Sequence, residues 1–217
     1  MIKENIEEVR ERIVEVCARI KVNPEKIAVI CVTKGRSVSQ IQEAVSLGLK
    51  YIGENRVQEA LEKYPQIPGV KWHMVGHLQS NKVRDALGIF DLIHSVDSVS
   101  LAEEINKQAL KINKIQDILL EVKTSPEVSK FGFSPELLAK ACEEITKFQN
   151  VKIKGLMTIA PLLSDAQEAR PYFSKLKALR DQLNSDWLLS MGMSSDFEVA
   201  IEEGADMIRL GRKIFEG

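Results

Sequence analysis

The stretch AVICVTKGRS, residues 28–37, joins an apolar, β-branched run to a lysine and a glycine that follow it directly. Short apolar runs bounded by a glycine are typical of buried β-strands, so this one predicts a strand that ends just before Lys34. A lysine in that place is either a solvated side chain at a strand end or a group held at a site. The stretch alone leaves both interpretations open.

Similar runs recur to the end of the chain, with helical patterns between them. Strands that alternate with helices require crossover connections and therefore predict a parallel sheet. Eight such strands are the number that closes a (β/α)8 TIM barrel, and an open doubly wound sheet is the alternative. The predicted strands cover residues 27–32, 50–53, 71–75, 92–95, 117–122, 151–157, 187–191 and 207–210.

An extra N-terminal helix is predicted before the first strand, because Ile6, Val9 and Ile13 recur at helical spacing between charged residues. Asn23 and Pro24 are expected to end it. A helical stretch is predicted after every strand except the last. No Gly/Ser/Pro-rich linker divides the sequence, which favours one domain over residues 1–217. The clearest later helices are predicted over residues 38–47, 99–111, 135–148, 165–183 and 197–203.

Composition narrows the classes of function. The chain has 30 Lys and Arg against 31 Asp and Glu, so no net positive charge indicates a nucleic acid or an anionic membrane as partner. No run approaches the roughly 18 apolar residues of a membrane-spanning helix. Three widely separated cysteines and three histidines without ligand spacing argue against disulfides and metal. We therefore expect a cytoplasmic protein without a metal site.

Lys34 is the first candidate for chemistry, because functional residues of a (β/α)8 barrel lie where strands end. Partial desolvation at the barrel mouth would favour its neutral amine, a nucleophile for a carbonyl and the requirement for a Schiff base. The alternative is a solvated lysine at a strand end.

A second candidate is an anion-binding turn near the C-terminus. Ser194 and Ser195 stand just before a helix predicted from Phe197, and Gly211 and Arg212 follow the last strand. Backbone N–H groups and hydroxyls in such loops bind phosphate in many barrels. The alternative is that Ser195, or Asp196 beside it, only caps the helix.

Further polar residues follow or interrupt other strands. Arg209 lies inside the last strand, where a cation must be paired or face a functional cavity. Asn55, His77 and Ser95 follow strands two, three and four; they could bind a ligand or cap loops, and His77 could act as an acid or base. The remaining histidines, at 73 and 94, are expected in the core or barrel lining.

Seven motifs occur in order from about residue 5 to the C-terminus: VTKGRS, YIGENRVQEA, WHMVGHLQSNK, IHSVDS, SKFGF, GLMTIAP and LSMGMSSDFEVAIEEGADMIRLGRKIF. Together they resemble the pyridoxal phosphate homeostasis protein family, which binds pyridoxal 5′-phosphate (PLP) in a barrel like the alanine racemase N-terminal domain. The resemblance implies that Lys34 is the Schiff-base lysine and that Arg209 faces the pyridine nitrogen.

The resemblance also assigns phosphate contacts to Ser194, Ser195, Gly211 and Arg212, and it places Asn55 at the cofactor's edge. His77 joins this predicted cofactor-binding set. Arg212 departs from relatives that carry a hydroxyl residue at its position. The loop at residues 123–133 is less glycine-rich than theirs, which weakens any role of Lys130.

The family resembles a carrier or buffer of PLP and not an established enzyme, so no catalytic residue is assigned. PLP is the expected ligand, PLP-dependent apoenzymes are possible recipients, and a monomer is expected. Two alternatives stay open. One is a weak PLP-dependent racemase with His77 or water opposite Lys34. The other is a barrel enzyme that forms an aldolase-type Schiff base with a phosphorylated metabolite.

Overall fold

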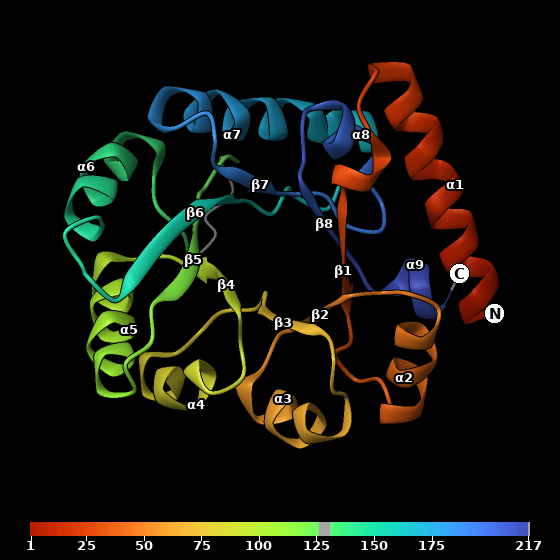
Figure 1. Cartoon of the computed structure of the whole chain (residues 1–217). Helices are drawn as coiled ribbons and strands as arrows, with labels where there is room; N and C mark the ends of the chain where they lie inside the picture. Colours follow the sequence, from red (N-terminus) through yellow and green to blue (C-terminus); the bar gives the residue numbers. More distant parts are fainter. Residues whose placement is uncertain (126–130, 217) are drawn as a thin grey trace.

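A computed structural model describes residues 1–125 and 131–216 of the chain. Eight parallel strands form a closed barrel in chain order, as Figure 1 shows end-on. The last strand pairs with the first, with Val29 opposite Ile208. This closure confirms the predicted barrel and excludes the open sheet. The strands are β1 (Ala28–Val32), β2 (Tyr51–Glu54), β3 (Lys71–Met74), β4 (Leu92–Val96), β5 (Gln116–Glu121), β6 (Val151–Met157), β7 (Leu188–Ser190) and β8 (Met207–Leu210).

Helices surround the barrel (Figure 1). The predicted leading helix is present as α1, and its apolar face is buried while its charged face is exposed. The helix ends at Ile20, where Lys21 caps it in a left-handed conformation with φ 58°, so Asn23 and Pro24 do not end it but begin the following 3-10 turn. The helices are α1 (Ile2–Ile20), α2 (Val38–Ser46), α3 (Val57–Lys63), α4 (Val83–Leu87), α5 (Val99–Lys111), α6 (Pro135–Ile145), α7 (Arg170–Leu183), α8 (Phe197–Glu202) and α9 (Arg212–Phe215).

Two helix predictions were wrong. Residues 165–183 do not form one helix, because a 3-10 turn precedes α7 and Pro171 fits only its first turn. The last strand is followed by a helix, α9. Its Ile214 and Phe215 are buried, and the Ile214 carbonyl accepts a hydrogen bond from Asn5 Nδ2 at 3.0 Å. This packing against α1 stabilises a helix too short to form alone.

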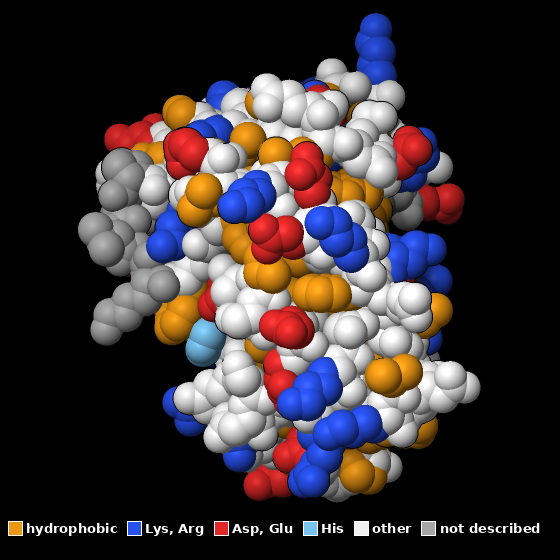
Figure 2. Space-filling model, turned by 90° about the vertical axis from the view of Figure 1, so that its left-hand side faces the viewer, with side chains coloured by type: hydrophobic (Ala, Val, Ile, Leu, Met, Phe, Trp, Pro, Cys, Tyr) orange, Lys and Arg blue, Asp and Glu red, His pale blue; other side chains and the backbone are white. Residues whose placement is uncertain are grey.

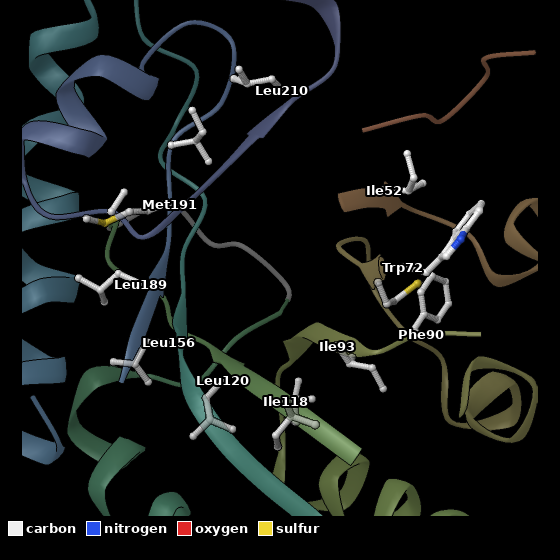
Figure 3. Close-up of a cluster of buried hydrophobic side chains, with 14 of the residues drawn as sticks. Ile52, Trp72, Phe90, Ile93, Ile118, Leu120, Leu156, Leu189, Met191 and Leu210 are labelled. Atoms are coloured by element: carbon white, nitrogen blue, oxygen red, sulfur yellow. The ribbon is translucent and has the colours of Figure 1, made fainter. Parts of the chain in front are cut away.

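The core has two layers. The larger one lies between strands and helices, and Figure 3 shows part of it, including Trp72, Phe90 and Ile118. The smaller one fills the barrel interior and includes Ile30, with Val32 packed against it. Alternate residues of each strand therefore face the two layers. On the face that Figure 2 shows, acidic and basic side chains are intermixed.

Gly155 lets strands β6 and β7 approach closely. It lies opposite Leu188, and a Cβ at residue 155 would overlap the Leu188 carbonyl oxygen. Any larger residue would force these strands apart, so the position requires glycine.

Candidate functional site

A cavity of about 280 Å³ opens at the carboxyl ends of the strands. The structure brings seven of the eight predicted cofactor-binding residues to this cavity. Its wall also has an apolar part, from Val32, Val75, Ile159, Leu162 and Met193, that sequence reasoning did not identify. The seven residues are Lys34, Asn55, Ser194, Ser195, Arg209, Gly211 and Arg212.

Charge in this cavity has one sign. Within the described part of the chain, its charged lining residues are Lys34, Arg209 and Arg212, and no carboxylate lines it. The lining itself is therefore positively charged, although the whole chain has a net charge of only −1. A small anion is therefore the ligand that the lining favours.

Lys34 stands at the rim of the cavity. Strand β1 ends at Val32, Thr33 is buried, and the Lys34 side chain is exposed. A turn follows, in which Gly35 has φ 70° and the Arg36 N–H donates to the Thr33 carbonyl. The expected partial desolvation of Lys34 is wrong for this structure, because the turn carries the residue beyond the buried part of the barrel.

Arg209 is the buried cation of the site. Its side chain donates from Nη1 to Ser190 Oγ at 2.7 Å and from Nη2 to the Thr158 carbonyl at 2.8 Å. Burial lowers the pKa of Arg209 to about 10, while the negative charges of Glu121 and Asp196 act to raise it. The guanidinium therefore stays protonated at neutral pH and adds a fixed positive charge to the cavity wall.

A chain of hydrogen bonds continues from Arg209 into the barrel. Ser190 Oγ lies 2.9 Å from His94 Nδ1, and His94 Nε2 lies 2.9 Å from His73 Nδ1. Both histidines are buried, as the sequence predicted. Burial lowers the pKa of His73 to about 4 and that of His94 well below its ordinary value. Both rings are neutral at pH 7, so Arg209 carries the positive charge in this series of hydrogen bonds.

The turn before α8 forms the opposite part of the cavity. Asp196 is the residue before the helix, and its Oδ1 accepts a hydrogen bond from the Met193 N–H at 2.6 Å. Asp196 thus stabilises the turn instead of capping the first helical N–H groups. Ser194 Oγ accepts from the Lys213 N–H at 3.2 Å, whereas Ser195 is exposed. This turn is thereby joined to the segment after β8.

Gly211 and Arg212 complete that part of the cavity. A Cβ on Gly211 would lie 3.2 Å from the Val32 carbonyl oxygen, so glycine permits the close approach of β8 to β1. Arg212 is exposed at the first position of α9. Backbone N–H groups and a guanidinium are both donors suited to an anion.

His77 does not line this cavity. It lines a neighbouring cavity of about 470 Å³ that shares Asn55 with the first. Its ring stacks on Phe131 with centroids 3.8 Å apart, and its Nδ1 lies 3.2 Å from Asp97 Oδ2. Ser95 donates to the Gly76 carbonyl at 2.5 Å and thus fixes a loop. Lys130 lies outside the described residues.

Sequence reasoning missed a buried ion cluster behind Lys34. Glu54 at the end of β2 contacts Lys63 at the end of α3, and Glu59 contacts the same lysine. The i, i+4 spacing of Glu59 and Lys63 is a weak signal that could have indicated their pairing. Nothing in the sequence spacing indicates Glu54 as their third member.

Over residues 1–125 and 131–216, no cluster of three or more His, Cys, Asp or Glu side chains could hold a metal ion. None of the helices described is both long and apolar enough to cross a membrane.

Fold and site together define a class of protein: a closed parallel barrel with an amine, a buried guanidinium and a serine-containing turn at its carboxyl mouth. The alanine racemase N-terminal domain family matches residues 1–216. The chain is 44% identical over 219 residues to the pyridoxal phosphate homeostasis protein of Aquifex aeolicus, covering 98% of this chain and 96% of that one. The chain therefore belongs to the pyridoxal phosphate homeostasis protein family, within the alanine racemase N-terminal domain fold.

Solved structures agree with this placement. The barrel superposes with a TM-score of 0.86 on PipY of Synechococcus elongatus PCC7942, a structure with PLP bound. That match has 36% sequence identity and covers 99% of this chain and 100% of PipY. Alanine racemase of Clostridium difficile 630 matches at 16% identity with a TM-score of 0.78, covering 99% of this chain and 58% of the racemase. The second likeness concerns the fold alone.

Proposed function

We propose that this protein binds PLP in the 280 Å³ cavity, through Lys34, and takes part in PLP homeostasis. The observation that carries the proposal is the lining itself, which combines a primary amine, serine hydroxyls and cations without a carboxylate. PLP has an aldehyde, a pyridine nitrogen and a phosphate, and the donor set fits all three. The volume suits a small ligand, since it falls just below the range of about 300–1,000 Å³ for larger ligand pockets.

Lys34 would hold the aldehyde covalently. The neutral amine nitrogen adds to the aldehyde carbon, and loss of one water leaves a Schiff base, so no oxidant or reductant is needed. The reverse reaction, addition of water, returns both partners. Exposure of Lys34 at the rim supports reversible loading, because ligand and water can both reach the amine.

Arg209 would face the pyridine nitrogen and donate a hydrogen bond to it. When bound, PLP supplies an electron-withdrawing ring, which is strongest when its nitrogen is protonated. A guanidinium with a pKa of about 10 keeps its own proton at neutral pH and leaves the ring nitrogen unprotonated. Arg209 therefore favours storage of the aldehyde over chemistry that requires an electron sink.

The phosphate would lie at the turn before α8. Ser194 and Ser195 offer hydroxyls there, and Gly211 and Arg212, in the segment after β8, line the same cavity. The Arg212 guanidinium replaces the hydroxyl residue expected at that position. Asn55 would contact the edge of the ring. His77, which lines the neighbouring cavity, would act on the ligand only after moving.

The cavity offers little support for the racemase alternative, which needs a second base opposite Lys34. Tyr51 opens β2 at the other end of the barrel and lines a cavity there. Tyr64 packs edge-on against Trp72, and Tyr172 lies in α7. We therefore favour a carrier that delivers PLP to apoenzymes as a monomer.

The three cysteines are buried and form no disulfide, which suits the reducing conditions of the cytoplasm.

A titration with PLP tests the proposal. Purified protein should develop the yellow absorption of an imine, and borohydride followed by peptide mass measurement should locate the adduct on Lys34. Lys34→Ala should lose both signals, whereas Lys82→Ala, a lysine of the neighbouring cavity, should keep them. A colourless wild-type protein, or an adduct elsewhere, would refute the proposal.

Delivery needs a second experiment. Loaded protein and free PLP are mixed in parallel with a PLP-dependent apoenzyme, and recovery of that enzyme's activity is followed. Recovery faster than spontaneous release from the carrier supports delivery, and recovery limited by spontaneous release argues for storage only. Exchange of amino-acid α-protons in deuterated water, if it depends on Lys34 and exceeds that of free PLP, would favour the racemase instead.

A further inference from the structure

A buried ion cluster lies directly behind the Lys34 turn. The Lys63 ammonium donates to Glu54 Oε1 at 2.7 Å, to Glu59 Oε1 at 2.6 Å and to the Thr33 carbonyl at 2.6 Å. Thr33 Oγ1 also donates to Glu54 Oε1, at 2.6 Å. The Lys63 and Glu54 side chains are 8% and 0% exposed. This cluster joins β1, β2 and α3 at one point.

The cluster fixes the backbone on both sides of Lys34. Thr33, the residue before Lys34, is held by Lys63 through its carbonyl and by Glu54 through its hydroxyl. The Gly35 N–H, after Lys34, donates to Glu59 Oε1 at 2.6 Å. Lys34 is thus the middle residue of a turn whose two neighbours are both anchored to charged side chains.

None of the three charged residues lines the PLP cavity. Glu54 follows Gly53 on β2, and its side chain points to the helix layer, where Lys63 lies, while Asn55 lines the cavity. The cluster therefore does not line the cavity itself, but it holds the backbone that carries Lys34.

Such a cluster is costly to bury, and stability alone explains it poorly. Buried ion pairs often contribute no more than apolar residues of equal volume would. Glu54 Oε2 has no hydrogen-bond partner within the described structure, which adds to that cost. Burial raises the pKa of Glu54, although the hydrogen bonds from Lys63 and Thr33 oppose the shift. A role in orientation accounts for retaining charged groups here.

We propose that Glu54, Glu59 and Lys63 are positioning residues, which hold the Thr33–Gly35 turn so that the Lys34 amine meets the aldehyde of PLP. This inference rests on the proposed function of Lys34. An exposed lysine has several freely rotating bonds, so its attack depends on a fixed point of attachment. Misplacement of a reacting group by about 1 Å can cost on the order of a hundredfold in rate.

Glu59 is the position to change, because its side chain is 25% exposed, whereas those of Lys63 and Glu54 are 8% and 0% exposed. Glu59→Ala removes the anchor of Gly35 and one partner of Lys63. Glu59→Gln keeps an oxygen acceptor for both. Glu62→Ala is the matched control, since Glu62 is exposed on the same helix and its side chain makes none of the hydrogen bonds or ion pairs found in the described structure.

The rate of imine formation with PLP and the equilibrium affinity are measured by absorbance for all variants, beside melting temperatures. Glu59→Ala should form the imine about tenfold more slowly or bind PLP about tenfold more weakly. Glu59→Gln should recover most of this loss, and Glu62→Ala should match the wild type. Thr33→Val, which removes the hydroxyl contacts with Glu54 and with the Gly53 carbonyl, should reduce the rate in the same direction.

Unchanged rate and affinity in folded Glu59→Ala would overturn the inference, as would a loss that Glu59→Gln does not recover. A lower melting temperature with normal imine formation would show a purely structural role and would overturn it too. Failure of the proposed function is distinguishable, because then the wild-type protein itself would form no imine on Lys34.

Discussion

The buried histidine pair predicts how stability depends on pH. His73 and His94 are 4% and 0% exposed and share a 2.9 Å hydrogen bond. Burial lowers the pKa of His73 from 6.5 to about 4. His73→Asn is the informative change, because the asparagine side chain can occupy the position of imidazole Nδ1 and keep a hydrogen bond to His94 without titrating in this range.

The sign and the size follow from linkage. Between pH 6.5 and about 4 the unfolded chain binds a proton at residue 73 that the folded chain does not bind, so the free energy of unfolding falls as pH falls. The contribution of His73 is complete above pH 6.5. At pH 5, which is about 1.5 pH units lower, the loss is about 2 kcal/mol at 1.36 kcal/mol per unit. This is a large part of a typical stability of about 5–15 kcal/mol.

Urea unfolding at pH 7.5 and pH 5 measures the effect, and only the difference between the two pH values is compared. The wild type should lose about 2 kcal/mol more than His73→Asn. His77→Asn, which removes an exposed histidine, should not relieve the loss. If His73→Asn loses as much as the wild type, the neutral, desolvated state assigned to His73 is wrong.

Two other changes test the barrel itself. Gly155→Ala should destabilise the protein by about 3 kcal/mol or more, because its Cβ would overlap the Leu188 carbonyl. Gly88→Ala is the control: the nearest atom to its Cβ would lie 3.5 Å away, so its melting temperature should change little. Equal melting temperatures for the two would contradict the close packing of β6 and β7. Burial raises the pKa of Glu121 to about 7 from 4.5, so ionisation destabilises the fold as pH rises through that interval. At pH 8 the free energy of unfolding, measured with urea, should therefore be about 1–3 kcal/mol higher for Glu121→Gln than for the wild type. This difference should disappear near pH 4.5.

The sequence predicted the barrel well because most residues of its strands are buried or partly buried and apolar. Parallel strands covered on both faces read as continuous apolar runs, such as Ala28–Val32, and these runs mark the strand ends closely. Once the ends are located, the polar residues that follow them must gather at one mouth. This is why seven predicted residues share one cavity although they are spread from residue 34 to residue 212.

The sequence could not predict the direction in which the side chains of the loops point. His77 follows β3 as Asn55 follows β2, yet contacts with Asp97 and Phe131 turn its ring into the neighbouring cavity. Those partners come from distant parts of the chain. The exposure of Lys34 has the same origin, since it depends on a turn held by Glu59. Side chains outside regular strands are placed by tertiary contacts that local patterns do not record.

Strand alternation explains why the amine and its support are neighbours in sequence. On β1, Ile30 and Val32 face the barrel interior while Cys31 faces the helices, and Thr33 continues the outer series. Lys34 then falls on the cavity side. On β2 the same alternation puts Glu54 outside and Asn55 in the cavity wall.

The pairing of these two strands brings both series together. Val32 lies opposite Gly53, so Thr33 reaches Glu54 on the outer face, and the residues that follow each of them line the cavity. A shift of one residue in β1 would exchange the two faces, burying Lys34 among the helices and exposing Thr33 to the cavity. The register of β1 against β2 therefore determines the positions of both the Lys34 amine and the ion cluster. A variant that changes one face of these strands should also be tested for its effect on the other face.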